Sequence, residues 1–238
     1  MKLYIEQRPV TAQPGQSLLE LIKDLGLDDA HLSRRPLAAK IAGEVFTLNY
    51  IPLRQKDLER TGVRAAMAAG DGQVQLLRYS DAAGRAVYRR TAQFVIFLAL
   101  RQLWPLAKGK VSCTLGSSVY IQVMGPEDFS ASRLKERVTE LVEQDIPLIR
   151  RRVSREDAIK RFGADGQMDK ARLLSWRPWD FFDEYAYEDF SDYYYGEMAP
   201  STGYLTVWEL LPADGGFLLL YPSDENPDIL SNRPSMPN

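Results

Sequence analysis

The apolar run Phe94–Leu100 is the feature that most constrains how this chain can fold. It lies inside a helical pattern that covers residues 91–104 and stops at Pro105. Arginines bracket the run on both sides, and it is far shorter than the roughly 18–20 apolar residues of a membrane span. We therefore expect a long helix of a soluble protein, with no membrane partner.

Residues 1–80 show a different pattern, made of short alternating segments and turn signals. Ser17 can cap a helix that ends at Gly26. Residues 54–69 begin charged and end rich in alanine, which suits a helical insertion near residues 54–72. Strands are expected at residues 2–6, 37–41, 44–48 and 73–79. This region is predicted to be a helix packed on a small mixed sheet.

A stretch of small and turn-forming residues, Ser80–Gly84, marks the expected boundary between two domains. Beyond it, the long helix is followed by a hairpin around Gly116, with strands at residues 111–115 and 119–124. The remaining elements are helices at 130–144 and 154–162, a strand at 149–153 and short strands between 184 and 221. We predict an α+β fold with domains at residues 1–80 and 84–222, and a proline-containing linker at 223–238.

The charge balance gives no overall positive field, so any site for a polyanion must be local. The 238 residues include 30 basic and 32 acidic side chains, so no overall positive field attracts nucleic acid or an anionic membrane. The N-terminus lacks the apolar run of a signal peptide, and the single cysteine, Cys113, cannot form an internal disulfide. We expect a cytoplasmic protein in which Cys113, alternating with Val111 and Leu115, is a small buried packing residue.

The chain lacks the residues of two common kinds of functional site. A phosphate-binding P-loop needs a glycine five positions before Gly109–Lys110 and a hydroxyl residue after it, but Trp104 and Val111 stand there. With His31 as the single histidine, a zinc site of the His/Cys kind and a nucleophile–base pair are both excluded. We predict no catalytic residue, no metal and no cofactor, and we place His31 in a surface loop.

Two segments carry charged and aromatic groups that could contact a ligand. Arg150, Arg152 and Arg155 are candidate phosphate contacts. Because alternate strand residues point to opposite faces, a solvated edge with one or two salt bridges is the preferred interpretation. Residues 176–196 interleave aromatic residues with acids, which would repel an RNA backbone, so we predict core-facing aromatics with the acids outside.

Two resemblances cover most of the chain. Residues 2–52 resemble a TGS domain, the ubiquitin-like β-grasp module of threonyl-tRNA synthetases, in length and turn placement. The second resemblance is more specific. It rests on the helix residues Thr91–Pro105, the Gly116 hairpin with Tyr120, and the segment Ile149–Ala158. In order and spacing these segments resemble the synthetase editing domain, the second additional domain of threonyl- and alanyl-tRNA synthetases.

The chain departs from the editing family at the residues that carry its chemistry. That family has two histidines four residues apart on the helix, and a later cysteine and histidine four apart, which bind metal or act on the mischarged ester. Here the first pair is Arg90 and Phe94, and the second is Tyr194 and Met198. Phenylalanine and methionine offer no imidazole or hard ligand, and arginine does not release its proton. The resemblance therefore implies that zinc binding and ester hydrolysis are lost.

The replacing residues resemble a second family, the bacterial uridine-kinase-like nucleoside kinases. The segments concerned are Val87–Thr91, Asp192–Gly196, Pro200–Tyr204 and Gly216–Leu219. In that family a TGS domain and a histidine-free editing-like domain precede a P-loop kinase domain. The resemblance implies a non-catalytic N-terminal binding or regulatory module. Its partner would be a C-terminal kinase domain, with ATP and Mg, if such a domain follows in the full-length protein.

Three functions stay open at this point. A cleft at the old editing positions would suit a nucleoside, a nucleotide or an RNA end, through stacking and one fixed cation. Its lining would be Arg90, Phe94, Tyr120, Asp192, Tyr194 and Met198. The same positions could equally be filled by packing residues, leaving a structural domain with no ligand. Ancestry shared with the TGS domain points instead to a tRNA- or ribosome-associated interaction protein.

Overall fold

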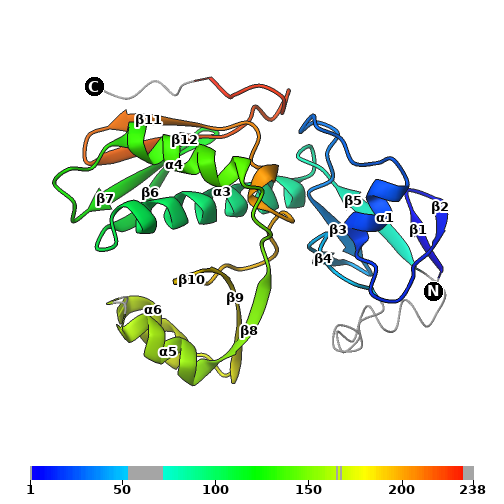
Figure 1. The fold of residues 1–238 in the computed structure, drawn as a ribbon, viewed down its shortest axis with the longest axis horizontal. Coiled ribbons are helices and arrows are strands. Elements are labelled where there is room, and N and C mark those ends of the chain that lie inside the picture. The colour runs from blue at the N-terminus through cyan, green and yellow to red at the C-terminus, as the bar shows by residue number, and fades with distance from the viewer. Residues whose placement is uncertain (1, 53–71, 165, 167, 233–238) are drawn as a thin grey trace. The chain divides into compact units, whose positions relative to one another are not determined.

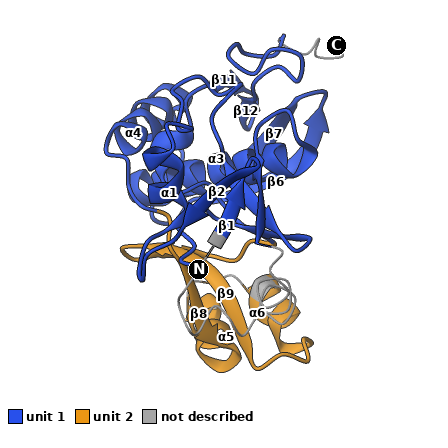
Figure 2. Cartoon of the chain, turned by 90° about the vertical axis from the view of Figure 1, so that its right-hand side faces the viewer, with its two compact units in different colours: residues 1–147, 196–238 blue, residues 148–195 orange. Residues whose placement is uncertain are grey.

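The computed structural model describes residues 2–52, 72–164, 166 and 168–232, and is drawn in Figure 1. It is a mixed α+β structure with several sheets, as predicted. The chain divides into two compact units, which Figure 2 colours separately. Unit 1 comprises residues 1–147 and 196–238, and unit 2 comprises residues 148–195. The predicted helical insertion at residues 54–69 lies outside the described residues, and the predicted domain boundaries stay a prediction.

The first sheet of unit 1 has the strand order β2-β1-β5-β3-β4. Its strands are β1 (Lys2–Ile5), β2 (Arg8–Thr11), β3 (Ala38–Ile41), β4 (Glu44–Phe46) and β5 (Gln73–Leu77). β1 and β5 are parallel, and the other neighbours are antiparallel. Helix α1 (Leu18–Asp24) buries Leu18, Leu21 and Ile22 in a core shared with the strands. The predicted helix on a mixed sheet is thus confirmed.

Local sequence signals fix both ends of α1. The Ser17 hydroxyl accepts a hydrogen bond from the Glu20 N–H at 3.2 Å, and the Glu20 carboxylate accepts one from the Ser17 N–H at 2.6 Å. This reciprocal capping box satisfies two of the amide groups that a helix N-terminus leaves unpaired. Gly26 follows the helix with φ of 65°, a left-handed conformation that glycine adopts at little cost.

The β1–β2 turn is the strained part of this sheet. Strand β2 was not predicted because it contains Pro9, which is tolerated on an edge strand, where its missing N–H faces no partner. The two turn residues, Glu6 and Gln7, have φ of 47° and 67°, values that two-residue hairpins normally assign to asparagine and glycine. The Arg78 guanidinium supports the turn by an ion pair with Glu6, with Nη1 and Oε1 2.6 Å apart.

The central helix of unit 1, α3 (Ala82–Leu103), begins inside the predicted domain boundary. The boundary stretch was misread as a loop because Gly84 looked like a turn residue. Gly84 is instead a packing position, since a β-carbon there would lie 1.9 Å from the Arg78 carbonyl oxygen. Val95, Ile96 and Leu98 are among its buried residues, so the expected long apolar helix is confirmed. Among the described residues, no helix is both long and apolar enough to cross a membrane.

A four-stranded antiparallel sheet packs against one side of α3 (Figure 1). Its order is β11-β12-β7-β6, with β6 (Lys108–Leu115), β7 (Ser118–Met124), β11 (Glu209–Ala213) and β12 (Gly216–Leu220). A β-carbon at Gly109 would lie 2.5 Å from the Phe97 side chain, so Gly109 marks the face of β6 that meets α3. Its register partner Val123, and with it Ile121 and Val119, face α3 as well. Helix α4 (Ala131–Glu143), which Ser130 caps, packs on α3.

The prediction that Cys113 is a buried packing residue is wrong, because Cys113 is exposed. It lies on β6, an edge strand, and pairs with Tyr120 after a register shift between Val111 and Cys113. Tyr120 alternates with the residues that face α3, so Cys113 shares the opposite face of the sheet. Alternation in the sequence indicated a strand correctly but could not tell which face would be covered.

Unit 2 is a small three-stranded antiparallel sheet with two helices. The elements are β8 (Arg150–Ser154), α5 (Arg155–Ala164), α6 (Met168–Ser175), β9 (Phe181–Tyr187) and β10 (Phe190–Asp192), in the sheet order β10-β9-β8. Its core contains Ala158, Phe162, Leu174 and Phe182. Helix α6 was not predicted. The predicted strand and the Ser154–Asp157 cap before α5 are confirmed, with the Asp157 N–H donating to the Ser154 hydroxyl at 3.1 Å.

The segment after β12 folds back on unit 1. Pro222 and Leu230 form an isolated β-bridge, and the Ser231 N–H donates to the Tyr221 carbonyl oxygen at 3.0 Å. Asp228 accepts hydrogen bonds from the Ser33 amide and hydroxyl groups at 3.0 and 2.5 Å. Residues 223–232 therefore have contacts that a free linker lacks, because the hydrogen-bonding partners lie far away in the sequence.

The turn strain gives a first prediction. Gln7→Gly should raise the free energy of unfolding by about 0.5–1 kcal/mol, because relief of the left-handed strain exceeds the entropy that glycine adds to the unfolded chain. Gln75→Gly, the same change at an exposed position in the middle of β5, should lower it by a similar amount. Urea unfolding of both variants checks this, and a loss of stability in Gln7→Gly would contradict the account of the turn.

Candidate functional site

The old editing positions on α3 meet the loop that carries Met198. The Arg90 Nε donates to the Glu197 carbonyl oxygen at 2.9 Å, and the Ala199 N–H donates to the Thr91 hydroxyl at 2.9 Å. Thr91 in turn donates its hydroxyl proton to the Val87 carbonyl oxygen, also at 2.9 Å. Met198 lies between the two loop residues that α3 anchors, so residues 90–91 and 197–199 form one site inside unit 1.

Gly196 allows the Arg90 guanidinium to lie flat on the loop backbone. A β-carbon at Gly196 would be 3.1 Å from Arg90 Cζ and from Nη2, closer than nearly all real contacts of this kind. The φ of Gly196 is 102°, a conformation that other residues rarely adopt. Glycine is therefore required here for two independent reasons, and one of them is the arginine that replaces a histidine of the editing family.

Packing side chains fill the space around this contact. Phe94, one helical turn after Arg90, and Met198 each have an exposed fraction of 0%. Glu197 is 4% exposed, and Arg90 is half-buried. Buried apolar groups at two of the four positions, together with a guanidinium at a third, provide neither a base nor a metal ligand. The arrangement holds the loop against α3.

The loop continues into a second set of anchors. The Thr202 hydroxyl donates to the Leu141 carbonyl oxygen at 2.5 Å and accepts from the Ile146 N–H at 2.8 Å. The Asn49 side chain donates to the Pro200 carbonyl oxygen at 2.8 Å, which ties the loop to the first 80 residues. Residues 196–203 are therefore hydrogen-bonded to α3, to the end of α4 and to the loop after β4.

The remaining predicted cleft residues lie elsewhere. Tyr120 is on the sheet face opposite α3, where its hydroxyl donates to the Asp214 carbonyl oxygen at 2.6 Å. Asp192 and Tyr194 belong to unit 2, where Asp192 pairs in register with Tyr185 of β9. The structure therefore brings together Arg90, Phe94 and Met198, but it places Tyr120 away from them.

The candidate phosphate contacts, on β8 and at the start of α5, are paired with acids on β9 or directly before it. Arg150 and Arg152 both contact Asp183, with nitrogen–oxygen distances of 2.5 and 3.2 Å. Arg155 lies 3.5 Å from Asp180, and its Nη1 also donates to the Arg177 carbonyl oxygen at 2.7 Å. The antiparallel register places these strands side by side, so the acids that the sequence separates by about thirty residues neutralise the arginines.

Glu184 is a buried acid that the sequence analysis placed outside the core. Its side chain is nearly inaccessible to solvent, and its two carboxylate oxygens accept hydrogen bonds from Arg161 Nη1 and Nη2 at 3.0 and 2.5 Å. Burial raises the pKa of Glu184 above its ordinary value of 4.5, although Arg161 and Arg151 act in the opposite direction. The periodicity of β9 indicates a strand, but it does not show which acid lies beneath the helices.

The aromatic residues of unit 2 are more exposed than predicted. The exposed fractions are 80% for Trp176, 63% for Trp179 and 44% for Phe181, so the prediction of core-facing aromatics is wrong for these three residues. Arg152 Cζ lies 4.1 Å from the centroid of the Phe181 ring. The segment joins α6 to β9 as a loop, and a loop cannot bury every large side chain in so small a core. We call Trp176, Trp179 and Phe181 the aromatic patch.

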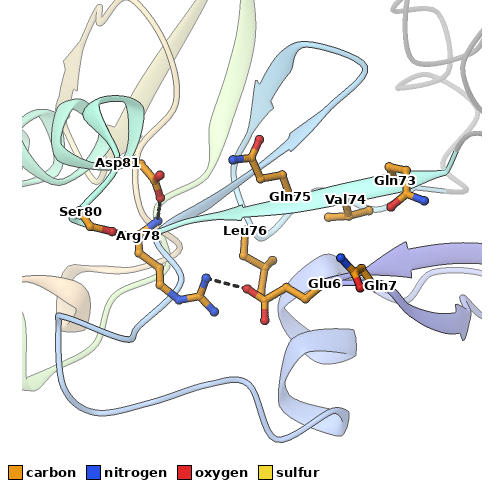
Figure 3. A pocket seen from close by; sticks show the side chains of 9 residues that line it. All are labelled: Glu6, Gln7, Gln73, Val74, Gln75, Leu76, Arg78, Ser80 and Asp81. Atoms are coloured by element: carbon orange, nitrogen blue, oxygen red, sulfur yellow. Dashed lines mark hydrogen bonds and ion pairs between the residues drawn. The ribbon is translucent and has the colours of Figure 1, made fainter.

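A polar pocket of about 480 Å³ lies on the first sheet of unit 1, away from the old editing positions (Figure 3). It opens beside β5, where β1 ends and the strained Glu6–Gln7 turn begins. Arg78 and Glu6 form an ion pair in it, and Asp81 accepts a hydrogen bond from the Arg78 N–H at 2.8 Å. The charged groups of this pocket thus satisfy one another. Among the described residues, no group of three or more His, Cys, Asp or Glu side chains is arranged to hold a metal ion.

The known proteins to which this chain is similar include several bacterial threonine–tRNA ligases. The chain is 28% identical over 207 residues to a threonine–tRNA ligase of Desulforamulus reducens. The matched region covers 85% of this chain and 30% of that enzyme. Threonine–tRNA ligases of Symbiobacterium thermophilum and Carboxydothermus hydrogenoformans are each 28% identical, over 209 and 203 residues. These two matches cover 85% and 84% of this chain and 29% of each enzyme. No family model matches the chain.

This chain is similar to the N-terminal region of threonyl-tRNA synthetase. It spans about 30% of the length of the curated relatives that it matches. The similarity supports the resemblance to the synthetase that its segments suggested.

A prediction about Phe94 separates a filled site from an open one. Phe94→Ala should lower the free energy of unfolding by about 3–5 kcal/mol, because it leaves a cavity where the side chain is fully buried. Phe97→Ala, the same change at a half-buried position of α3, should cost less. Urea unfolding measures both, and a cost below about 1 kcal/mol for Phe94→Ala would show that the site is open.

The buried acid gives a pH-dependent prediction. Since the folded-state pKa of Glu184 is raised, its contribution favours the folded chain below pH 4.5 and is lost as pH rises through the folded-state pKa. The stability of the unaltered chain relative to Glu184→Gln should therefore decrease between about pH 4 and pH 7. Urea unfolding of both proteins across this range measures the difference, and an increase with pH would contradict the assignment.

Proposed function

We propose that this chain is a non-hydrolytic RNA-binding module derived from the N-terminal region of threonyl-tRNA synthetase, with tRNA as its intended class of partner. The observation that carries the proposal is the filled editing site. The similarity to the synthetase extends over 85% of the chain, whereas Phe94 and Met198 are fully buried at positions where the chemistry would occur. A retained scaffold with a packed site is compatible with a binding role at another surface of the chain, without catalysis.

The first sheet of unit 1 and α1 support the TGS-like part of this proposal. One helix packs on a mixed five-stranded sheet in the order β2-β1-β5-β3-β4, as a β-grasp module would. The Asn49–Pro200 and Arg35–Gly203 hydrogen bonds, at 2.8 and 3.2 Å, join this region to the loop of the old editing site. The two regions therefore offer a partner one connected surface within unit 1.

The aromatic patch is the proposed point of contact with RNA. Exposed indole and phenyl rings can stack with unpaired bases, and each such contact contributes about 1–3 kcal/mol. The acids that would repel the RNA backbone are partly neutralised, because Asp183 and Asp180 pair with arginines of β8 and α5. With a formal charge of −2 for the whole chain, binding would be weak and sensitive to salt.

A second candidate function is a regulatory module of a uridine-kinase-like nucleoside kinase. The observation that favours it is the meeting of the segments that resemble that family. Arg90 in the first of these segments lies against Gly196 at the end of the second, because a β-carbon at Gly196 would be 3.1 Å from Arg90 Cζ. A nucleoside that raises the melting temperature of the isolated chain, while tRNA does not bind, would favour this second function.

Binding of labelled tRNA, followed by fluorescence anisotropy at low and moderate salt, tests the first function. We expect an affinity that falls steeply with salt. The double change Trp176→Ala and Trp179→Ala should weaken it at least about fivefold, because stacking is lost. Stability should change by less than about 0.5 kcal/mol, because both side chains are exposed.

Arg150→Gln serves as the control, since Arg150 is already paired with Asp183. It should change the tRNA affinity by less than about twofold. If Arg150→Gln weakens tRNA binding more than the tryptophan changes do, the RNA contact lies on β8 and not at the aromatic patch. Absence of any salt-sensitive binding to tRNA would reject the proposed function itself.

A further inference from the structure

We propose that the first half of α3 carries a phosphate-binding site built from Arg85 and Arg89, which the carboxylate of Asp224 covers. This inference goes beyond the proposed function, because it concerns a different face of α3 from the one that meets residues 196–199. It also holds whichever of the two candidate functions is correct.

Asp224 lies between the two guanidinium groups without satisfying either. Its Oδ1 is 3.7 Å from Arg85 Nε and 3.9 Å from Arg89 Nη2. Both distances exceed the length of a hydrogen bond, so the carboxylate is held by charge alone. More than half of the Asp224 side chain is exposed, whereas the two arginines are half-buried. The cations are therefore the fixed partners here and the carboxylate is the replaceable one.

Other parts of the fold hold both arginines in place. Arg85 Nη1 donates to the Tyr79 and Ser80 carbonyl oxygens at 3.2 and 2.7 Å, which leaves its Nε directed toward Asp224. Arg89 Cζ lies 5.1 Å from the centroid of the Tyr221 ring. The Tyr221 hydroxyl accepts a hydrogen bond from Gln93 at 3.2 Å, so the ring cannot turn away. This site is pre-organised before any ligand arrives.

A donor of Arg89 is left without use. Among the described residues, no acceptor meets the buried Nε of Arg89. Buried polar groups in proteins are nearly always hydrogen-bonded, and the exceptions mark places where a ligand or a proton acceptor is missing. An acceptor that enters beside Arg85 and Arg89 would satisfy this nitrogen, and the Asp224 carboxylate does not.

Phosphate is the ligand that this arrangement recognises best. Guanidinium groups present several donors in a rigid plane, which suits the oxygens of a phosphate group. A phosphate group has more terminal oxygens and a larger negative charge than a carboxylate, so it can bond to both arginines at once. It would displace a single carboxylate that makes no hydrogen bond to them. The phosphate can come from an RNA backbone or from a free nucleotide.

The segment that bears Asp224 permits this exchange. Ser223 and Ile229 are joined by a backbone hydrogen bond of 2.9 Å, and Asp228 is fixed to Ser33. The Asp224 side chain can therefore rotate out of the site without movement of the backbone around it. Asp224 acts as an internal competitor, which lowers the affinity of the site for phosphate.

The test measures inorganic phosphate binding by isothermal titration calorimetry with the full chain and its variants. Asp224→Asn should tighten phosphate binding by about threefold to tenfold, since the competing charge is removed and Asn cannot pair with two guanidinium groups. Glu225→Gln is the matched control, because it removes one negative charge from the next residue, which is also exposed. It should leave the affinity nearly unchanged.

Arg89→Gln and Arg85→Gln, each combined with Asp224→Asn, should weaken phosphate binding about tenfold or more. The gain in Asp224→Asn cannot arise from misfolding, so the proposal does not depend on how well the arginine variants fold. An Asp224→Asn affinity equal to that of Glu225→Gln, or weaker than that of the unaltered chain, would overturn the site.

Titration of Asp224→Asn with uridine monophosphate and with a short single-stranded RNA identifies the source of the phosphate. Tighter binding of the RNA supports a nucleic acid backbone, and tighter binding of the mononucleotide supports a free nucleotide. Whichever ligand binds more tightly, Arg89→Gln in the Asp224→Asn background must abolish that binding, or the proposal fails. Because inorganic phosphate binding is measured without tRNA, a failure of the proposed function leaves this test unaffected.

Discussion

The contact between α3 and the loop at residues 196–199 is the constraint on which the rest of unit 1 depends. Arg90 can lie against the loop because Gly196 has no side chain and a left-handed backbone. The hydrogen bonds of Arg90 and Thr91 then hold Met198 beside the helix. The same loop continues to Thr202, which fixes the end of α4. Loss of this contact would free the loop from α3, although α4 also packs directly on α3.

This contact bears on the proposal that a scaffold similar to that of a synthetase can persist without the editing chemistry. In the editing family, as the sequence resemblance implies, these positions hold metal or act on an ester. Here a guanidinium, a phenyl ring and a thioether occupy three of them, and two of the three are fully buried. Packing and hydrogen bonding hold these positions together in this chain.

Much of the fold could be predicted from local signals, because these act within a few residues. The Ser17–Glu20 box, the Ser130 cap and the Gly116 hairpin each define the limits of an element. Apart from the missed β2 and α6, the failures concern burial, which depends on distant segments. Cys113 lies on the sheet face opposite α3, Glu184 is buried beside Arg161, and Trp176 lies outside a core that is too small for it. Of the predicted cleft residues, Arg90, Phe94 and Met198 lie together, because helix and loop spacing places them. Tyr120 lies elsewhere, because spacing alone does not show which face of a sheet a residue occupies.

The central claim is that the old editing site is filled and chemically silent, and hydrolysis of a mischarged aminoacyl-tRNA ester tests it most directly. The purified chain should be mixed in excess with the radiolabelled ester, with and without added zinc, and the deacylation rate compared with that in buffer. The account predicts the same rate in all three samples. A deacylation rate that rises with protein concentration and falls in Arg90→Ala would contradict it.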